Sequence, residues 1–215
     1  MTDISNSDLI KLISLIKGAE SDNMGKCKIV AIQGSYRENG LTTSMLKYAV
    51  DKANRLGHEV TYLNLFEKKI DFCKGYRKCL ETEECVFKND DMPEVTRLIK
   101  NADVIILAAP VYWANTSAIV KNLFDRLLGA SMMETKTFPK PRLAGKRYIF
   151  FTACNTRMPF AKWVGQSTGI IRAVREYFKT SGIRCIGTVI CDNTGINTEV
   201  SERKIKKINK LLERI

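Results

Sequence analysis

The chain has 215 residues, of which 45% are hydrophobic, and its 35 Lys and Arg against 23 Asp and Glu give a formal net charge of +12. This length suits one α/β domain with a sizeable core, and five prolines and 13 glycines exclude a long disordered tract. The charge favours anionic partners such as phosphorylated cofactors, but the basic stretches 136–147 and 199–215 lack the stacking aromatics of a nucleic-acid module apart from Phe138.

The N-terminal residues predict an extension ahead of the main domain. Residues 5–17 have the pattern of an amphipathic helix, with apolar side chains at i, i+3, i+4 and i+7 from Leu9. Residues 18–26 are typical of a linker. We therefore divide the chain into a helical extension with its linker over 1–26 and an α/β domain over 27–215.

Cysteine usage and hydropathy indicate the compartment. The seven cysteines are odd in number and irregularly spaced, which is unlike a disulfide framework. No basic leader and no apolar run of transmembrane length is present in the sequence. We expect a cytoplasmic protein with reduced thiols, and neither nucleic acid nor membrane as a partner.

Strand and helix patterns alternate from residue 27 onward, with Asp91 and Glu94 forming a capping pattern and Gly129 expected to end a helix. Strands are expected over 28–33, 59–65, 103–109, 147–152 and 183–191, and helices over 43–56, 91–101, 116–128, 165–180 and 200–215. Repeated βα units predict a doubly wound five-stranded parallel sheet in the order 2-1-3-4-5, with helices on both faces. Ligands of such sheets lie at the carboxyl ends of the strands.

The loop after the first strand has the composition of a phosphate site. Four hydroxyls and one guanidinium stand at or just before the start of a helix, whose free N–H groups attract anions: Ser35, Arg37, Thr42, Thr43 and Ser44. The loop is neither a Walker A motif nor G-x-G-x-x-G, and it suits one terminal phosphate. The alternative is an ordinary capped turn with Thr42 as N-cap.

Three segments carry a family resemblance. GSYRENGLTTSML resembles the phosphate loop of NAD(P)H-dependent FMN reductases of the flavodoxin superfamily. APVYWANTSAIVKNLFDR resembles their flavin-ring loop and the helix after it, and CKGYRKCLETEECVFKNDDM resembles the cysteine-bearing insert of the branch that includes iron–sulfur flavoproteins. The resemblance covers residues 27–130 and implies a flavodoxin-like fold with FMN as cofactor and NAD(P)H as co-substrate.

The resemblance implies further cofactor contacts in two other loops. An isoalloxazine ring requires a flat surface and hydrogen bonds to its polar edge. The expected contacts are Pro110, Val111, Tyr112, Trp113 and Asn115 after the third strand, and Thr152 and Asn155 after the fourth. The alternative for Tyr112 and Trp113 is that they fill an edge of the core.

The insert after the second strand carries Cys73, Cys79 and Cys85. Iron–sulfur members of the branch carry four cysteines here, whereas Tyr76 occupies the second position of this chain. Because a cubane cluster is normally held by four thiolates, we assign no metal and predict no iron–sulfur cluster. Zinc with a fourth ligand from elsewhere, or reduced thiols in a degenerate insert, remain alternatives.

The resemblance implies an FMN-dependent oxidoreductase that passes reducing equivalents from NAD(P)H to a flavin, quinone, nitro or azo compound, or electron carrier. The flavin performs the chemistry, so no catalytic residue is assigned. The alternatives are a flavodoxin-type electron carrier, against which the charge of +12 counts, an iron–sulfur flavoprotein, or a flavin-free regulator. The resemblance also implies a homodimer or homotetramer.

Overall fold

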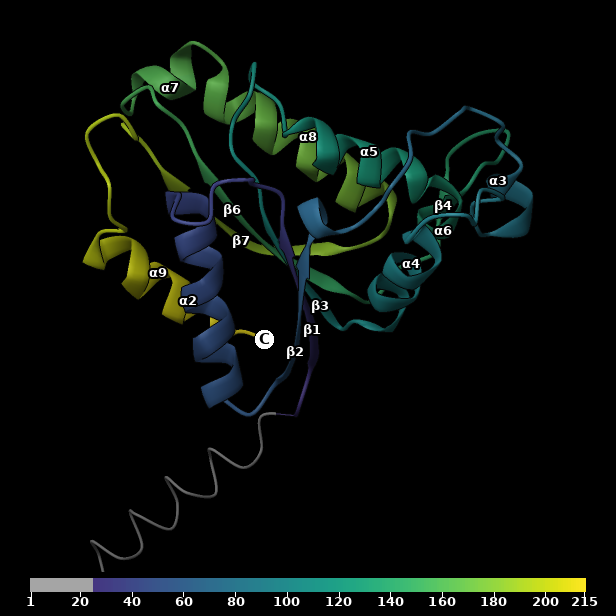
Figure 1. Ribbon diagram of the computed structural model, residues 1–215, viewed down its shortest axis with the longest axis horizontal. Coiled ribbons are helices and arrows are strands. Elements are labelled where there is room, and N and C mark those ends of the chain that lie inside the picture. Colours follow the sequence, from purple (N-terminus) through teal and green to yellow (C-terminus); the bar gives the residue numbers. More distant parts are fainter. Residues whose placement is uncertain (1–24) are drawn as a thin grey trace, which may run out of the picture.

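Five short runs rich in Val, Ile and Phe form the central sheet of the computed structural model, which describes residues 25–215 (Figure 1). The strand order is β2-β1-β3-β6-β7, and every neighbouring pair is parallel. The strands are β1 (Lys28–Gln33), β2 (Glu59–Asn64), β3 (Val104–Ala108), β6 (Arg147–Ala153) and β7 (Arg184–Cys191). The predicted flavodoxin-like fold and strand order are confirmed.

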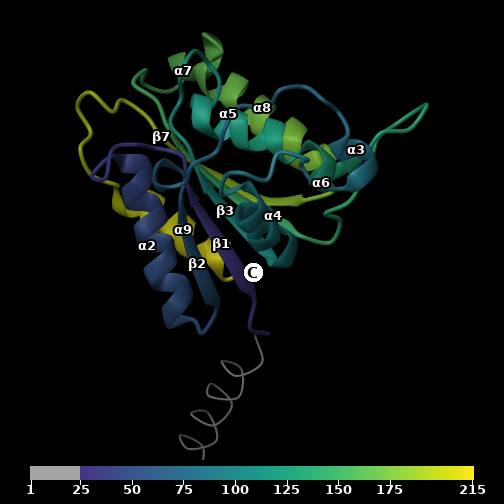
Figure 2. The same cartoon turned by 45° about the vertical axis from the view of Figure 1, so that its right-hand side comes forward.

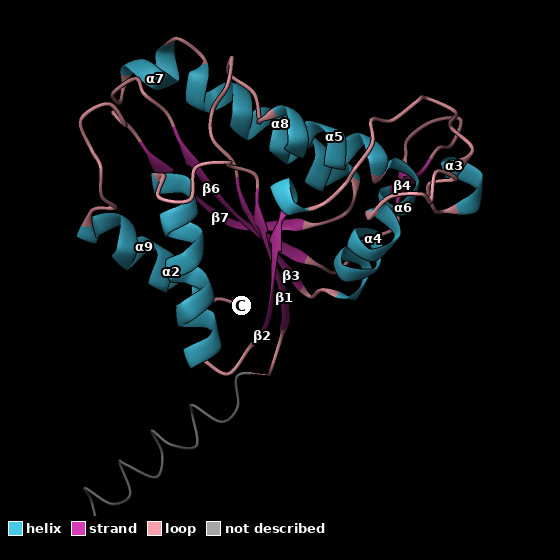
Figure 3. Cartoon of the chain, in the orientation of Figure 1, coloured by secondary structure: helices cyan, strands magenta, loops and turns pink. Residues whose placement is uncertain are grey.

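Helices cover both faces of the sheet, as Figure 3 shows. One face carries α2 (Leu41–Arg55) and α9 (Glu202–Leu212), and the other carries α4 (Met92–Asn101), α5 (Ala118–Arg126) and α8 (Gln166–Thr180). Alternate residues of one strand therefore enter different cores: Ile105 and Leu107 pack toward α5, and Ile106 packs toward α2. Because both faces of the central strands are buried, β1 and β3 are nearly continuous apolar runs.

Shorter elements lie mainly in the connections. They are η1 (Leu65–Glu67), α3 (Cys79–Thr82), α6 (Leu128–Ser131), α7 (Phe160–Trp163) and an antiparallel pair of β4 (Met132–Met133) with β5 (Lys140–Pro141). Figure 2 shows α3 beside α6, at the end of the molecule remote from α9. β4 and β5 are not among the predicted strands, because two-residue strands are too short to show a period.

Two predicted helix ends depend on tertiary contacts, and one of them is wrong. Asp91 is the N-cap residue of α4 as predicted, but its side chain makes no cap bond and accepts from the Lys69 N–H instead, while Asp90 Oδ1 accepts from the Met92 N–H at 3.1 Å. Gly129 does not end a helix but lies inside α6, where a Cβ atom would stand 2.0 Å from the carbonyl oxygen of Cys79. Gly129 therefore permits a close approach of two segments.

The remaining boundaries agree with the prediction to within three residues. Gly57 and Gly182, at φ +85° and +79°, follow the ends of α2 and α8 as predicted. The helix predicted over residues 5–17 lies outside the described residues. Over residues 25–215, no helix combines the length and the apolar character needed to cross a bilayer.

Candidate functional site

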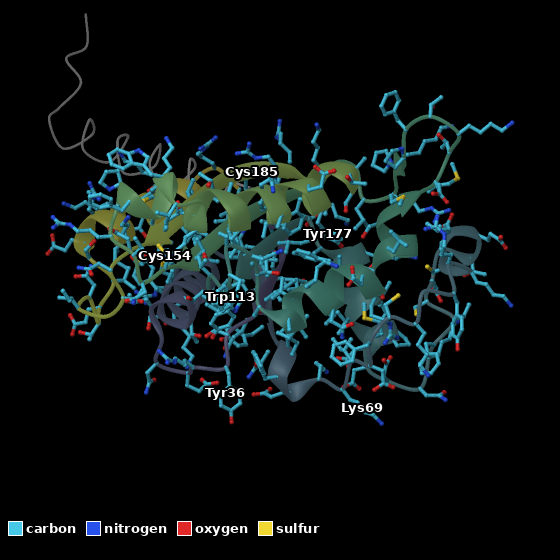
Figure 4. The ribbon with its side chains drawn as sticks, turned by 90° about the horizontal axis from the view of Figure 1, so that it is seen from above. Tyr36, Lys69, Trp113, Cys154, Tyr177 and Cys185 are labelled. Carbon is cyan, nitrogen blue, oxygen red and sulfur yellow. The ribbon has the colours of Figure 1, made fainter. Side chains whose placement is uncertain are left out.

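Four loops meet around a cavity of 540 Å³ at the carboxyl edge of the sheet. Figure 4 views the molecule from above and shows Tyr36, Trp113 and Cys154, which come from three of the connections at this edge. The volume lies in the range of small-molecule sites. The lining is Ser35, Arg37, Asn39, Gly40, Leu41 and Thr42 from the first loop, Pro110, Val111 and Tyr112 from the second, Ala153, Cys154 and Asn155 from the third, and Thr194, Asn197 and Thr198 from the fourth.

The amino end of α2 opens into this cavity. Gly40 is its N-cap, so the alternative of Thr42 as N-cap is wrong, and no side chain caps the helix. Its first turn also carries no acidic residue. The first N–H groups of a helix have no intrahelical acceptor and carry partial positive charge. This end of α2 is thus free to accept an anion, with the exposed Arg37 beside it.

The predicted phosphate-loop residues do not all face the cavity. Ser35, Arg37 and Thr42 line it. The Thr43 hydroxyl instead donates to the carbonyl oxygen of Arg37 at 2.8 Å, and Thr43 is fully buried. Ser44 is absent from the lining, and its N–H donates to the Gly40 carbonyl as the first bond of α2. Thr43 therefore supports the loop from behind.

Gly34 couples the phosphate loop to the neighbouring strand. Its N–H donates to the Ala108 carbonyl at 2.8 Å, and its own carbonyl accepts from the Ser117 hydroxyl at 2.7 Å. A Cβ atom here would stand 2.3 Å from Val120 Cγ2 and 3.1 Å from the Ala108 oxygen. Only glycine allows the loop to lie this close to α5.

The second loop ends in a tight, strained turn. The N–H and C=O groups of Tyr112 and Asn115 bond each other at 2.9 Å, with Trp113 and Ala114 between them at φ 52° and 59°. These are the angles of a type I′ turn, which residues other than glycine, asparagine and aspartate adopt at a cost. The turn packs against Gly169 of α8, where a Cβ atom would stand only 2.3 Å from the Ala114 oxygen.

This turn decides where the predicted ring contacts lie. Tyr112 lines the cavity with 56% of its surface exposed, and Trp113 is fully exposed, so the alternative of a filled core edge is wrong for both. Asn115 Oδ1 accepts from the Thr116 N–H at 2.8 Å. Asn115 lines a different hollow, of 560 Å³, between α5 and α8.

The third and fourth loops add residues that sequence reasoning missed. Asn155 lines the cavity as expected, whereas Thr152 is fully buried and its hydroxyl has no hydrogen-bond partner. Cys154 also lines the cavity, and burial raises the pKa of its thiol, which the charge of Asp192 raises further. The residues from the β7–α9 loop could have been suspected, since DNTGINT follows the carboxyl end of a strand.

The cysteine insert is held on α5 by buried polar groups. Arg126 Nη1 donates to Asp90 Oδ2 at 2.5 Å, and the two side chains are 1% and 0% exposed. The same guanidinium donates to the carbonyl oxygens of Asp71 and Phe87, and Asn122 donates to that of Ile70 at 3.1 Å. Both ends of the insert are thereby fastened to one helix.

The three insert cysteines line one small cavity of 30 Å³ together with Arg126. That volume admits about one or two waters, not a four-iron cluster. Tyr76, which stands at the second cysteine position of the iron–sulfur pattern, is 60% exposed. Among residues 25–215, no three His, Cys, Asp or Glu side chains are arranged to hold a metal ion. The residues present therefore do not fit a four-thiolate cluster.

A family model described as NADPH-dependent FMN reductase matches residues 27–158, which is more than half of the chain. The chain belongs to this family. The match begins at the residue before β1 and ends in the loop after β6, so it includes the first three of the four loops around the cavity. The family predicted from the three sequence segments is confirmed.

Curated relatives of this FMN reductase-family chain include an iron-sulfur flavoprotein of Archaeoglobus fulgidus, 42% identical over 101 residues, or 47% of this chain and 46% of the relative. An iron-sulfur flavoprotein of Clostridioides difficile is 28% identical over 188 residues, covering 85% and 76% of the two chains. FMN reductase (NADPH) of Escherichia coli is 30% identical over 103 residues, covering 46% and 48%. The chain spans about half the length of most of the curated relatives that it matches.

Solved structures support the fold of the family. Smu.1420 of Streptococcus mutans superposes with a TM-score of 0.67 at 20% identity, covering 87% of this chain and 97% of that one. An FMN-dependent NADH-azoreductase of Bacillus anthracis, solved in complex with FMN, superposes with a TM-score of 0.67 at 13% identity, covering 87% of this chain and 96% of that one. At these identities the likeness concerns the architecture alone.

Proposed function

We propose that this protein is an FMN-dependent oxidoreductase that passes reducing equivalents from NAD(P)H through bound FMN to a second acceptor. Family membership supports the cofactor and the reaction class. The observation that carries the proposal is the 540 Å³ cavity, which joins the uncapped amino end of α2 to a loop bearing Pro110 and Tyr112. One cavity thus offers an anion site and a flat, partly apolar surface.

The residues that would hold FMN divide by the part of the cofactor they suit. The N–H groups of α2, with Ser35, Arg37 and Thr42, would bind the phosphate. Pro110, Val111 and Tyr112 would lie along the ring, and Asn155 would donate to a polar edge. We assign Thr43 and Ser44 supporting roles in the phosphate loop.

Three further predicted contacts lie outside the lining of this cavity. Trp113 and Asn115 belong to the strained turn that follows the lining residue Tyr112, and Thr152 is buried next to the lining residue Ala153 in the chain. Bound FMN supplies the electron-transfer chemistry, so the protein needs to bind, orient and shield it. The acceptor proposed is a flavin, quinone, nitro or azo compound, or an electron carrier.

A second copy of the chain is part of the proposal. Trp113, Phe160 and Trp163 are exposed by more than half of their surface, close to the turn and the start of α8. Exposed aromatic groups of this kind are typical of interaction surfaces. A homodimer or homotetramer would cover them.

Flavin content and reductase activity test the proposal. The purified chain should be yellow and should release FMN, not FAD, on denaturation. It should also oxidise NADH or NADPH with a generic acceptor, which a one-electron carrier would not do. A colourless chain that refuses added FMN would overturn the assignment.

The variant Arg37→Ala tests where the phosphate lies. Loss of one charged hydrogen bond should weaken FMN binding by about 1.5–3 kcal/mol. The matched control is Arg55→Ala, which removes an exposed arginine at the other end of α2. Equal FMN affinities of the two variants would place the phosphate elsewhere.

A further inference from the structure

A buried amide stands directly behind the phosphate loop. Gln33 is the last residue of β1 and is 1% exposed. Its Nε2 donates to the carbonyl oxygen of Ser35 at 2.8 Å and lies 3.4 Å from Glu38 Oε1. Its Oε1 accepts a short hydrogen bond from the Tyr62 hydroxyl of β2. Neither Gln33 nor Tyr62 is among the site residues predicted from the sequence.

The orientation of this amide follows from its partners. A backbone carbonyl can only accept, so the amide must direct its N–H₂ group toward Ser35. The amide oxygen is then directed to Tyr62, which remains a neutral donor because burial, with smaller contributions from Glu38 and Glu67, raises its pKa to about 12. Tyr62 thus holds Gln33 in the orientation that the loop requires.

Other side chains bind three further carbonyl groups of the loop. The Gly34 oxygen accepts from the Ser117 hydroxyl at 2.7 Å, and the Arg37 oxygen accepts from the Thr43 hydroxyl at 2.8 Å. Lys47 Nζ lies 3.4 Å from the Glu38 carbonyl oxygen and pairs with the Glu38 carboxylate at 2.8 Å. With that of Ser35, four carbonyl dipoles of the loop are therefore bound by protein donors.

We propose that Gln33, held by Tyr62, is a positioning residue that sets the phosphate loop for a dianionic phosphate ester. Gln33 does not line the cavity, so it acts through Ser35 and Glu38. It holds the Ser35 carbonyl away from the anion, so that the first N–H groups of α2 and the hydroxyl proton of Ser35, whose Oγ accepts from the Arg37 N–H at 3.3 Å, remain for the ligand. This inference rests on the proposed FMN site and assigns the recognition of its phosphate to residues behind the loop.

A comparison of the affinities for FMN and riboflavin distinguishes this positioning role from a general structural role. Riboflavin has the same ring as FMN but no phosphate, so a change confined to the phosphate loop should alter FMN affinity alone. We would titrate the full-length chain, freed of flavin, with each compound and follow flavin fluorescence. The variants are Gln33→Met, which keeps the size of the side chain, and Tyr62→Phe, which removes only the hydroxyl.

Gln33→Met should raise the Kd for FMN about tenfold, as expected for one lost buried hydrogen bond, and leave the Kd for riboflavin within about twofold. Tyr62→Phe should raise the Kd for FMN about threefold, because it frees the amide without removing it. The control is Thr96→Val. Thr96 is a buried polar residue of α4, on the face of the sheet opposite α2, and this substitution should change neither the Kd for FMN nor the Kd for riboflavin.

The possible outcomes separate this inference from the proposed function. If the wild-type chain binds neither flavin, the proposed function fails and the inference fails with it. If the wild type binds FMN but both variants keep its affinity, or lose FMN and riboflavin equally, only the positioning role is overturned. If Gln33→Met does not fold, the ratio of the two affinities in Tyr62→Phe decides.

Discussion

The ion pair between Arg126 and Asp90 offers the sharpest test of what holds the cysteine insert in place. In Arg126→Met the Asp90 carboxylate stays fully buried, with only the N–H groups of Asp71 and Met92 as partners. The Phe87 carbonyl oxygen also loses its donor, and that of Asp71 keeps only Asn122 Nδ2 at 3.4 Å. Breaking a buried ion pair from one side costs about 3–5 kcal/mol, and we expect a loss of unfolding free energy in this range.

An exposed pair on the same helix provides the control. Lys121 Nζ lies 2.5 Å from Asp125 Oδ1, but their side chains are 58% and 44% exposed. Lys121→Met should therefore cost less than about 1 kcal/mol. Urea unfolding followed by circular dichroism, at one fixed concentration of free FMN, measures both variants on the same scale. If Arg126→Met lost no more unfolding free energy than Lys121→Met, the buried Arg126–Asp90 pair would not be what holds the insert.

The pKa of Asp90 predicts how the loss of unfolding free energy in Arg126→Met depends on pH. Burial alone would raise the pKa of Asp90, but hydrogen bonds from Arg126 and from two backbone N–H groups outweigh it and hold the pKa below the usual 3.8. A carboxyl group whose pKa is lower in the folded state than in the unfolded state stabilises the fold at pH values above its unfolded-state pKa. This stabilisation is lost as the pH falls through the folded-state pKa. The difference between wild type and Arg126→Met should be largest near neutral pH and shrink in acid.

Three further predictions concern other parts of the chain. Gly129→Ala should destabilise the fold by about 1–3 kcal/mol in thermal unfolding, because the new methyl group would meet the Cys79 carbonyl, whereas Gly25→Ala meets nothing within 4 Å and should be neutral. Anaerobically purified protein should contain no stoichiometric iron or acid-labile sulfide, because three thiols replace the usual four; stoichiometric amounts that disappear in Cys79→Ala would contradict this. Light scattering should give a particle mass at least twice 24.3 kDa, and the monomer mass at working concentration would count against the homo-oligomer.

The amino-acid sequence determined the strand order and the edge at which ligands bind. A short apolar run rich in β-branched residues, such as 104–108, indicates a strand with both faces covered, and this favours a parallel sheet with helices on each side. The bounds of β1 agree with the prediction residue for residue, since Gly34 ends the run. The phosphate loop was recognisable because hydroxyls and an arginine stand together at a helix start.

Only the tertiary structure decided which of those side chains face the cavity. Thr42 and Thr43 are neighbours with the same chemistry, but successive helical residues point about 100° apart, so one lines the cavity and the other supports the loop. Gln33 was hidden for a related reason: at the end of an apolar strand its role depends on Tyr62, which is 29 residues away in the chain. Arg126 and Asp90 likewise meet across 36 residues. Local patterns carry no information about such contacts, because they form only when folding brings together segments that are distant in the chain.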